Sequence, residues 1–527
     1  MIDELLTSDP QVLEAYSTDA SLFKVRPKWV AFPKNTEDIK KLVTFAKENH
    51  ETLTPRAGGS DMGGGPLSES IVIDVTKHLN KMGEIQRTHL RNDKGESFVT
   101  VEPGVFYRDF ESKTLEQGLI LPCYPASKNL AALGGMIGNN CGGEMSLRYG
   151  KMENFIIESK WIFADGNEYT IKPGVVDNEY SQKVLELVKN NYDLLQKAKP
   201  KVSKNSAGYY LWNVWDGKTF DLNKLLVGTQ GTLGILTEAT LRLVSVKKHH
   251  DLIALFFKSW DELPQVVNAI LPYQPDSLET FDKETIKLGL RFMPEIAKKA
   301  HSSFLGFAAK FLPEALIGVK MGGLPELVVL VEVAEESEEG VKKKVSSILE
   351  ALKPFNIWHR LIEKDSEEEK FWIVRRESFN LLRQHVKGRK TAPFIDDFCI
   401  PLEAVPEFLP KAKAILEKHD INVNIAGHAG NGNFHIIPLM DLTKESEREK
   451  LLPVADEFYS LVAEYHGTTT GEHNDGIVRT PFLNKIYSPE VLELFKQVKH
   501  IFDPQNIFNP GKKVLGTVED FKRKLAP

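Results

Sequence analysis

Residues 425–435 read IAGHAGNGNFH, and the interpretation of the whole chain depends on this stretch. Gly427, Gly430 and Gly432 make a helix costly here. The residues before and after the glycines, VNIA and FHIIPL, are apolar and β-branched, so the pattern predicts a strand, a turn and a second strand. Such a hairpin sets His428 and His435 side by side at one end of a sheet, where two imidazoles can bind a divalent metal.

A second short motif, GEH at 471–473, contains a carboxylate that can extend this site. With Glu472, the two histidines would form a His2Glu set with open positions, as catalytic zinc or manganese sites have. In an extended backbone Glu472 and His473 point to opposite sides, so Glu472 can bind the metal while His473 faces the substrate as a general base. The alternative is two hydrogen-bonded histidines in a glycine turn and a surface Glu-His pair.

The composition excludes several classes of protein. The chain has 527 residues, of which 42% are hydrophobic and 27% charged. Its net charge is −6, so it lacks the excess of positive charge that is typical of nucleic-acid-binding proteins. No apolar run reaches the ~18 residues of a spanning helix. The three cysteines form no CxxC pair, which argues against zinc knuckles and iron–sulfur clusters. The acidic start MIDELL is unlike a signal peptide, so we expect a cytoplasmic protein.

Glycines cluster in three stretches of the first half of the chain. In LTPRAGGSDMGGGPLSESIVIDVT, which begins at Leu53, they lie between a strand ending near Pro55 and a strand at 71–75. A Rossmann fingerprint needs a helix after the glycines, so that interpretation fails. The backbone N–H groups can still form a nest for a diphosphate, and the alternative is a flexible surface loop.

The other two stretches are LAALGGMIGNNCGG at 130–143 and GTQGTLGILTEATLRL at 228–243. The first lets the backbone lie flat against a planar ligand, or else it is a tightly packed turn. The second predicts a glycine-rich turn that enters an alternating strand.

Together these motifs resemble a known family. PRAGGSDMGG, LGGMIGNNCGG followed by RYG, and VGTQGTLGILTEATL resemble the FAD-binding half of the vanillyl-alcohol-oxidase-type (PCMH-type) flavoproteins. GHAGNGNFH, GEHNDG and DPQNIFNPGK resemble the D-lactate and D-2-hydroxyglutarate dehydrogenase branch, and the resemblance runs from about residue 27 to 512. It implies an α+β fold, with a PCMH-type FAD-binding domain and an antiparallel-sheet substrate cap.

The resemblance also implies which residues hold the cofactor. Ser60 stands where relatives with covalent flavin carry histidine, so noncovalent FAD is expected. The residues assigned to FAD are Pro55, Arg56, Ala57, Gly58, Gly59, Ser60, Asp61, Gly63, Pro125, Gly134, Gly135, Gly138, Asn139, Asn140, Gly142, Gly143, Gly231, Gly234, Ile235 and Asn509.

We expect four segments in the chain: an N-terminal helix within 1–25, the FAD-binding domain at 26–246, the cap at 247–465, and a C-terminal segment at 466–527 that returns to the FAD domain. In the cap, strands such as LIALFF and LVVLVEV alternate with helices at 337–353 and 402–419.

The cap also contains FWIVRRESFN, in which the resemblance assigns Arg376, before Glu377, to the substrate carboxylate. The alternative is an exposed helix arginine like its neighbour Arg375. Close 2-hydroxyglutarate enzymes carry a lysine shortly before a DLSLP-like strand, but residues 395–401 read IDDFCIP here. That loss argues against a dicarboxylic substrate, whereas GEHNDG resembles a branch in which some members oxidise 2-hydroxyglutarate.

These features predict an FAD-dependent, metal-assisted dehydrogenase that oxidises a D-2-hydroxy acid, with D-lactate favoured over 2-hydroxyglutarate and glycolate. The alternatives are an oxidase that reduces oxygen and a noncatalytic flavin subunit of an electron-transfer complex.

The electron acceptor is expected to be a separate molecule, a quinone, an iron–sulfur protein or another carrier, because the chain has no cysteine after Cys399. Residues 283–323 combine apolar residues with lysines, which suits peripheral contact with the inner face of a membrane. The alternative is a helical hairpin packed on the cap with solvated lysines.

Overall fold

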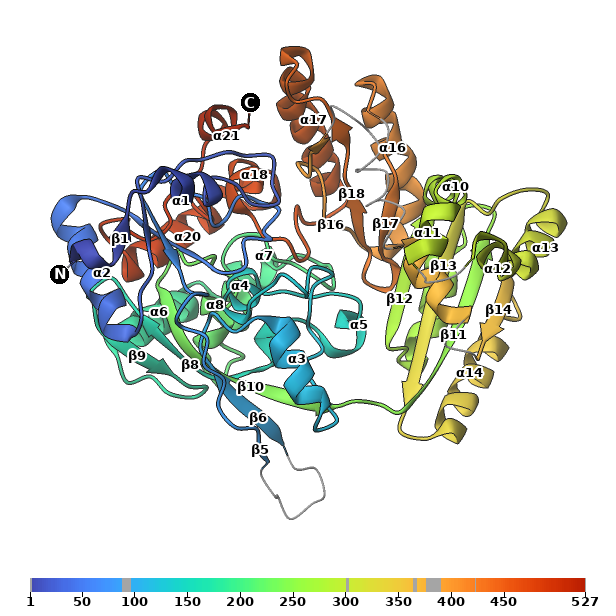
Figure 1. Cartoon of the computed structure of the whole chain (residues 1–527), viewed down its shortest axis with the longest axis horizontal. Coiled ribbons are helices and arrows are strands. Elements are labelled where there is room, and N and C mark those ends of the chain that lie inside the picture. The colour runs from blue at the N-terminus through green and yellow to red at the C-terminus, as the bar shows by residue number, and fades with distance from the viewer. Residues whose placement is uncertain are drawn as a thin grey trace. The chain divides into compact units, whose positions relative to one another are not determined.

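The computed structural model describes residues 2–87, 96–299, 303–363, 367–375, 390–421 and 423–526. The chain forms two compact units (Figure 1). Unit 1 comprises residues 1–200, 204–246 and 468–527, and unit 2 comprises residues 201–203 and 247–467.

The first sheet of unit 1 has the strand order β1-β2-β4-β3. Strands β2, β4 and β3 are parallel, and β1 pairs with β2 antiparallel. Helix α2 buries Ile39, Leu42 and Val43 in the core of this sheet. Its N-cap is Asn35, whose side chain accepts the N–H of Asp38. The elements are β1 (Leu6–Thr7), α1 (Pro10–Ala15), β2 (Trp29–Ala31), α2 (Thr36–Asn49), β3 (Leu53–Arg56) and β4 (Ile71–Asp74).

The predicted N-terminal helix within 1–25 is wrong in extent, because α1 has only six residues. Leu6 and Thr7 pair with β2 as a strand. Pro10 suits only the first turn of a helix. The chain after α1 does not continue as a helix, and Phe23 bridges to Leu525 near the C-terminus.

The second sheet of unit 1 is antiparallel, with the order β5-β6-β10-β8-β9, and β7 also pairs with β10. Its long strand β10 alternates buried and half-buried residues, as predicted. The strands are β5 (Gln86–Arg87), β6 (Ser97–Val101), β7 (Leu119–Ile120), β8 (Ile156–Ile162), β9 (Glu168–Ile171) and β10 (Ile235–Ser245).

The remaining helices of unit 1 belong to its middle and C-terminal segments. Near the C-terminus, Leu53 N–H donates to Ile507 O at 2.7 Å, and Asn509 N–H donates to Leu53 O at 2.9 Å, so this segment runs along β3. The helices are α3 (Tyr107–Leu115), α4 (Leu133–Asn139), α5 (Ser146–Tyr149), α6 (Glu179–Asn190), α7 (Tyr192–Ala198), α8 (Asn223–Leu226), α18 (Gly476–Arg479), α19 (Leu483–Ile486), α20 (Pro489–Phe502) and α21 (Val518–Lys524).

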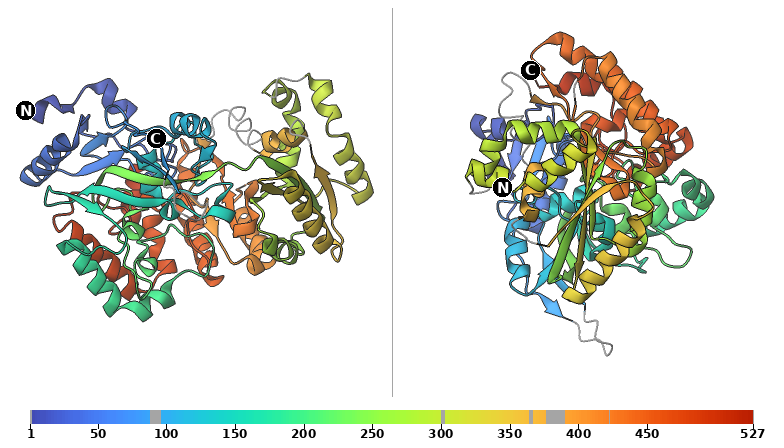
Figure 2. Two further views of the ribbon diagram at one scale, coloured as in Figure 1. Left: turned by 90° about the horizontal axis from the view of Figure 1, so that it is seen from below. Right: turned by 90° about the vertical axis from the view of Figure 1, so that its right-hand side faces the viewer.

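Unit 2 is built on an antiparallel sheet with the order β14-β11-β13-β12-β17-β18-β16. Helix α14 packs along β11 and β13 (Figure 2). The strands are β11 (His249–Phe257), β12 (Ser277–Asp282), β13 (Leu327–Glu335), β14 (Trp358–Ile362), β15 (Lys390–Thr391), β16 (Phe398–Cys399), β17 (Ile425–His428), β18 (Asn433–Ile436) and β19 (Leu439–Met440). The helices are α9 (Leu263–Ile270), α14 (Glu338–Leu352), α16 (Val405–Lys418) and α17 (Glu445–Glu464), besides those of residues 283–323.

Four short helices occupy residues 283–323: α10 (Lys283–Arg291), α11 (Met293–Lys299), α12 (Phe304–Ala309) and α13 (Leu312–Met321). Phe292, Ile296, Ala297 and Phe307 form a small core of their own. Part of the segment therefore packs on itself, as the helical alternative expected.

Candidate functional site

The hairpin predicted at 425–435 is confirmed. Strands β17 and β18 pair with Ala426 opposite His435 and His428 opposite Asn433. His428 and His435 therefore lie diagonally on one face. Their ring centroids are 5.3 Å apart and the rings meet edge to face, at 85°.

A carboxylate contacts each histidine of this pair at Nδ1. His428 Nδ1 lies 2.6 Å from Glu279 Oε1, and His435 Nδ1 lies 3.2 Å from Asp396 Oδ1. A carboxylate accepts the Nδ1 proton, which fixes the tautomer with its lone pair on Nε2. That is the arrangement in which metal-ligating histidines are held in proteins.

Sheet pairing and an ion pair hold Glu279. Strand β12 pairs with β17 so that Glu279 lies opposite His428. The guanidinium of Arg375 forms an ion pair with Glu279, and the Arg375 side chain is only 10% exposed. The expectation that Arg375 is an ordinary exposed arginine is therefore wrong. Arg376 and Glu377 lie outside the described residues, so the role of Arg376 stays a prediction.

Asp397 is a second carboxylate near His435 whose oxygen atoms could bind a metal. It has a left-handed backbone, with φ at 66°, and its Oδ1 accepts a hydrogen bond from Asn433 Nδ2 at 3.0 Å. Ligand atoms of Asp397 and His435 lie within 4.8 Å of each other. Unit 2 therefore offers imidazole and carboxylate ligands on neighbouring strands.

In unit 1, Glu472 and His473 lie in a bend rather than in an extended strand. Their ligand atoms lie within 4.8 Å of each other, so the expectation that they point to opposite sides is wrong. The Glu472 carboxylate forms an ion pair with Lys204, and Lys151 Nζ donates to Gly471 O at 2.8 Å. Two lysines therefore hold this bend.

The three glycine-rich stretches of unit 1 come together around Gln230. Its Nε2 donates to Asn139 Oδ1 at 3.2 Å, and its Oε1 accepts from Gly476 N–H at 2.8 Å. Asn509 Nδ2 donates to Gln230 O at 2.7 Å and to Gly65 O at 3.0 Å. One surface of backbone and amide groups thus forms from segments far apart in the sequence.

Several of these glycines are required by close backbone contacts. A Cβ on Gly58 would lie 2.0 Å from Leu130 O, and one on Gly134 would lie 2.8 Å from Pro103 O. A side chain at Gly58 would push two of the stretches apart, and one at Gly134 would collide with the backbone at Pro103. The loops therefore present closely packed backbone, which fits the FAD expected there.

Asp61 accepts two of the glycine N–H groups of the predicted diphosphate nest. Its Oδ1 accepts the N–H of Gly63 at 2.7 Å and of Gly65 at 3.0 Å. Its Oδ2 accepts from Asn139 Nδ2 at 2.8 Å and from Gln230 Nε2 at 3.4 Å. A carboxylate thus occupies the place where an anionic ligand would bind.

A second acid lies close to Asp61. Burial raises the pKa of Asp19 to about 7, and the negative charge of Asp61 adds to the rise. Negative charge is therefore present beside the nest, and the positive charge of Arg56 acts in the opposite direction on the pKa of Asp19.

The other residues assigned to FAD include some with structural contacts. Arg56 donates to Tyr16 O and Thr18 O, at 3.3 and 2.8 Å, and so ties the N-terminal segment to β3. Asn140 is the left-handed C-cap of α4, and its Oδ1 accepts from Glu153 N–H at 3.0 Å. Ile235 is buried in the core. Their roles toward FAD stay predictions.

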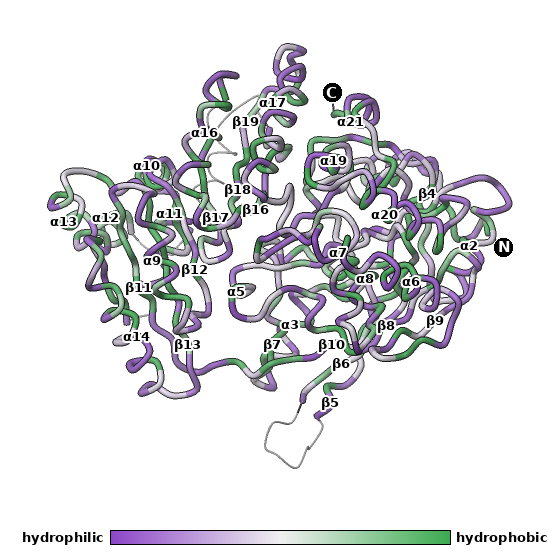
Figure 3. Tube along the Cα trace, turned by 180° about the vertical axis from the view of Figure 1, so that it is seen from behind, coloured by the Kyte–Doolittle hydropathy of each residue, from purple (hydrophilic) through white to green (hydrophobic). Residues whose placement is uncertain are grey.

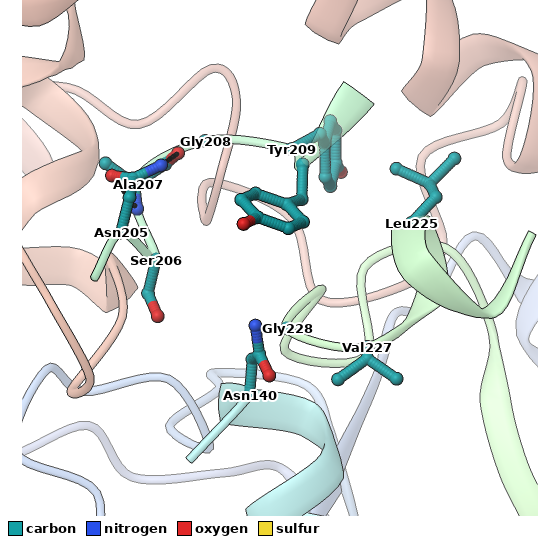
Figure 4. A pocket seen from close by; sticks show the side chains of 10 residues that line it. Asn140, Asn205, Ser206, Ala207, Gly208, Tyr209, Leu225, Val227 and Gly228 are labelled. Carbon is teal, nitrogen blue, oxygen red and sulfur yellow. Dashed lines mark hydrogen bonds between the residues drawn. The ribbon is translucent and has the colours of Figure 1, made fainter. Parts of the chain in front are cut away.

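A pocket in unit 1 joins two of these stretches (Figure 4). Asn140 and Gly228 contribute to its wall, together with residues 205–210. Tyr209, which lines the pocket, shares a hydrogen bond of 2.7 Å with the hydroxyl group of Thr232. Two of the glycine-rich stretches, at 130–143 and 228–243, therefore border a pocket.

Sequence reasoning missed Glu279, Arg375, Lys204 and Gln230 as site residues. Glu279 lies 149 positions before His428, in a strand with no motif. Of the four, Gln230 is the residue that the sequence could most readily have indicated, because it lies within the GTQG turn at 228–231.

Comparisons with known proteins show which families and folds this chain is similar to. A family model described as "FAD linked oxidases, C-terminal domain" matches residues 246–513, and one described as "FAD binding domain" matches residues 27–172. The fold is also similar to that of 4-ethylphenol oxidase from Gulosibacter chungangensis, with a TM-score of 0.67 and 15% identity over 98% of this chain and 95% of that one. A p-cresol methylhydroxylase has the same TM-score and identity over 97% of this chain and 94% of that one. The expected α+β fold of the PCMH type is confirmed.

Curated relatives include a D-2-hydroxyglutarate dehydrogenase of Haemophilus influenzae, 26% identical over 94% of this chain and 49% of that protein. A D-lactate dehydrogenase of Archaeoglobus fulgidus is 27% identical over 92% and 91%, and a glycolate oxidase subunit of Bacillus subtilis is 28% identical over 94% and 91%. The chain spans about half the length of the first of these relatives.

We predict that Glu279→Gln weakens metal binding. The amide cannot accept the Nδ1 proton of His428 as strongly as a carboxylate, so the ligand nitrogen becomes less basic. We expect Zn²⁺ affinity, measured by competition with a chromophoric chelator, to fall about 10- to 100-fold. His435→Ala is the positive control.

Glu335→Gln is the matched control, because Glu335, at the end of the neighbouring strand β13, also pairs with a basic residue, Lys344 of helix α14. Glu279→Gln leaves Arg375 with an uncompensated charge, so Glu279→Gln/Arg375→Met should regain stability without regaining Zn²⁺ affinity. Wild-type Zn²⁺ affinity in Glu279→Gln would contradict the positioning role.

We also predict that Asp61→Asn tightens FAD binding. The isosteric amide removes a negative charge from the nest, so the apoprotein should bind FAD about tenfold more tightly or better, as measured by quenching of flavin fluorescence. Asp165→Asn, in another turn of unit 1, should leave the affinity unchanged. Weaker binding by Asp61→Asn would instead mean that Asp61 organises the loop for FAD.

Proposed function

We propose that this chain, which belongs to the family of FAD-linked oxidases, is a dehydrogenase that oxidises a D-2-hydroxy acid to the 2-oxo acid. The observation that carries the proposal is the histidine pair on hairpin β17–β18, with a carboxylate on each Nδ1. The names of the relatives support it, since they include dehydrogenases of D-2-hydroxyglutarate and D-lactate.

A metal assists the proposed reaction. His428, His435 and Glu472 would hold it, and Asp397 is a further oxygen ligand, whose carboxylate lies within 4.8 Å of a ring nitrogen of His435. Among the described residues, the group of metal-capable side chains that contains Asp397 and His435 does not include His428. A divalent ion, zinc or manganese, supplies positive charge that favours loss of the substrate's hydroxyl proton. Glu279 and Asp396 keep the two imidazoles in the ligating tautomer.

His473 is the general base in this proposal. An imidazole has an ordinary pKa near neutrality, so it can take up the hydroxyl proton at physiological pH. The bend at 471–473 is held by Lys151 and Lys204, which limits the movement of the base. FAD, held noncovalently by the glycine-rich stretches of unit 1, supplies the hydride acceptor when bound.

The substrate is best described as a monocarboxylate, with D-lactate favoured. Residues 395–401 lack the lysine that the resembling 2-hydroxyglutarate enzymes carry shortly before this strand, and Asp396 contacts His435. A carboxylate there does not favour a second carboxylate on the substrate. D-2-hydroxyglutarate and glycolate remain the second candidates, because of GEHNDG and the named relatives.

The electrons pass to a separate acceptor, a quinone or an electron-transfer protein, and the protein works in the cytoplasm with peripheral membrane contact. A noncatalytic flavin subunit is the alternative from another class. It would have no need for carboxylate-backed histidines in unit 2 or for Glu472 and His473 in unit 1.

The test of the proposal is anaerobic flavin reduction by a panel of D- and L-2-hydroxy acids. We expect D-lactate to bleach the flavin absorbance fastest, D-2-hydroxyglutarate to act more slowly, and the L-acids to be inert. A flavin that no 2-hydroxy acid reduces would point to the noncatalytic subunit, and steady hydrogen peroxide production in air would point to an oxidase.

A second prediction concerns the base. His473→Ala should keep its metal but lose about 10²- to 10⁴-fold in kcat, the usual contribution of a general base. The control is His249→Ala, at an exposed position of β11. If single-turnover flavin reduction in His473→Ala ran at the wild-type rate, another group would be the base.

A further inference from the structure

Exposed apolar side chains are concentrated in one part of unit 2. Among the described residues, eleven large apolar side chains are exposed, and seven of them lie between positions 290 and 324. They are Leu290, Phe304, Leu305, Leu312, Leu316, Val319 and Leu324. A concentration of this kind marks a surface that binds something apolar.

Helix α13, labelled in Figure 3, carries three of these side chains. Ile317 and Met321 pack on the core of the unit 2 sheet. Leu312, Leu316 and Val319, at helical spacing, are 62%, 64% and 79% exposed. A helix that is apolar on both its inner and its outer side needs a second apolar environment.

The charges around this helix are asymmetric. Between Ser303 and Leu324 the charged residues are Lys310, Glu314 and Lys320. The Glu314 side chain is only 11% exposed, because it pairs with Arg360 and with Lys370, whose Nζ lies 2.9 Å from its carboxylate. The acid is therefore held inward, and the outer side presents apolar groups beside lysines.

We propose that the α12–α13 face, defined as Phe304, Leu305, Leu312, Leu316 and Val319, binds the surface of an anionic lipid bilayer. Amphipathic helices that lie in a membrane interface combine leucine, phenylalanine and lysine in this way. Lys310 and Lys320 lie next to the face, and Lys298 and Lys299 end the neighbouring helix α11. These cations would meet the lipid phosphates.

The composition of the face favours a lipid surface over a protein partner. Residues 303–324 contain neither tyrosine nor tryptophan, and their outward charge comes from lysine. Protein interfaces are enriched in tyrosine, tryptophan and arginine and depleted in lysine. No helix among the described residues is long and apolar enough to cross a membrane, so the contact is a surface one.

The test is sedimentation of the full-length, FAD-loaded protein with vesicles of phosphatidylcholine and phosphatidylglycerol in equal parts. We expect the protein to sediment at low salt and to be released by high salt or by vesicles of phosphatidylcholine alone. Leu312→Gln/Leu316→Gln should lower the partition coefficient at least tenfold. Leu115→Gln/Val175→Gln, at exposed sites in unit 1, should sediment like wild type.

Two results would overturn the proposal. One is wild-type protein that stays in the supernatant at low ionic strength. The other is a Leu312→Gln/Leu316→Gln variant that sediments as well as wild type. A third outcome would assign the face to a second copy of the chain. In it, light scattering shows that the wild-type protein is a dimer and the double variant a monomer, and neither protein sediments with vesicles. Sedimentation does not depend on turnover, so this test fails or succeeds separately from the proposed reaction.

Discussion

The antiparallel register of β17 and β18 is the constraint on which the candidate site depends. A slip of one residue would move His435 to the other face of the sheet and separate it from His428. Gly427 fixes this register, because a Cβ there would lie 2.3 Å from Asn433 O. Gly432 has φ at 63° and would place a Cβ 2.2 Å from Ile400 O. The glycines of this motif therefore serve close strand packing rather than flexibility.

Glu279, the carboxylate that contacts His428, has a chemical role in addition to its place in the sheet. Burying Glu279 costs solvation free energy, which the ion pair with Arg375 offsets only in part. Buried ion pairs of this kind add little net stability compared with apolar residues of similar volume. The pair is better explained by what Glu279 does to the imidazole, since it fixes a tautomer and raises the basicity of the other nitrogen.

Local patterns in the sequence predicted the elements that are defined by local chemistry. The hairpin, strand β10 and helix α14 follow from residue spacing alone, whereas the length of the first helix did not, because Leu6 and Thr7 pair with a strand more than twenty positions away. Glu279 and Arg375 reach the histidines through sheet pairing and tertiary packing, which leave no motif in the sequence. The glycine stretches predicted a common surface, but Gln230, at its centre, is identified only by its hydrogen bonds.

The proposed ligand set draws on both units, since His428 and His435 belong to unit 2 and Glu472 to unit 1. Lys204 pairs with Glu472 within unit 1, so it can balance that carboxylate whenever the metal does not. The ion pair lowers the cost of burying Glu472, and it also makes metal binding a competition between a lysine and a divalent ion for one carboxylate.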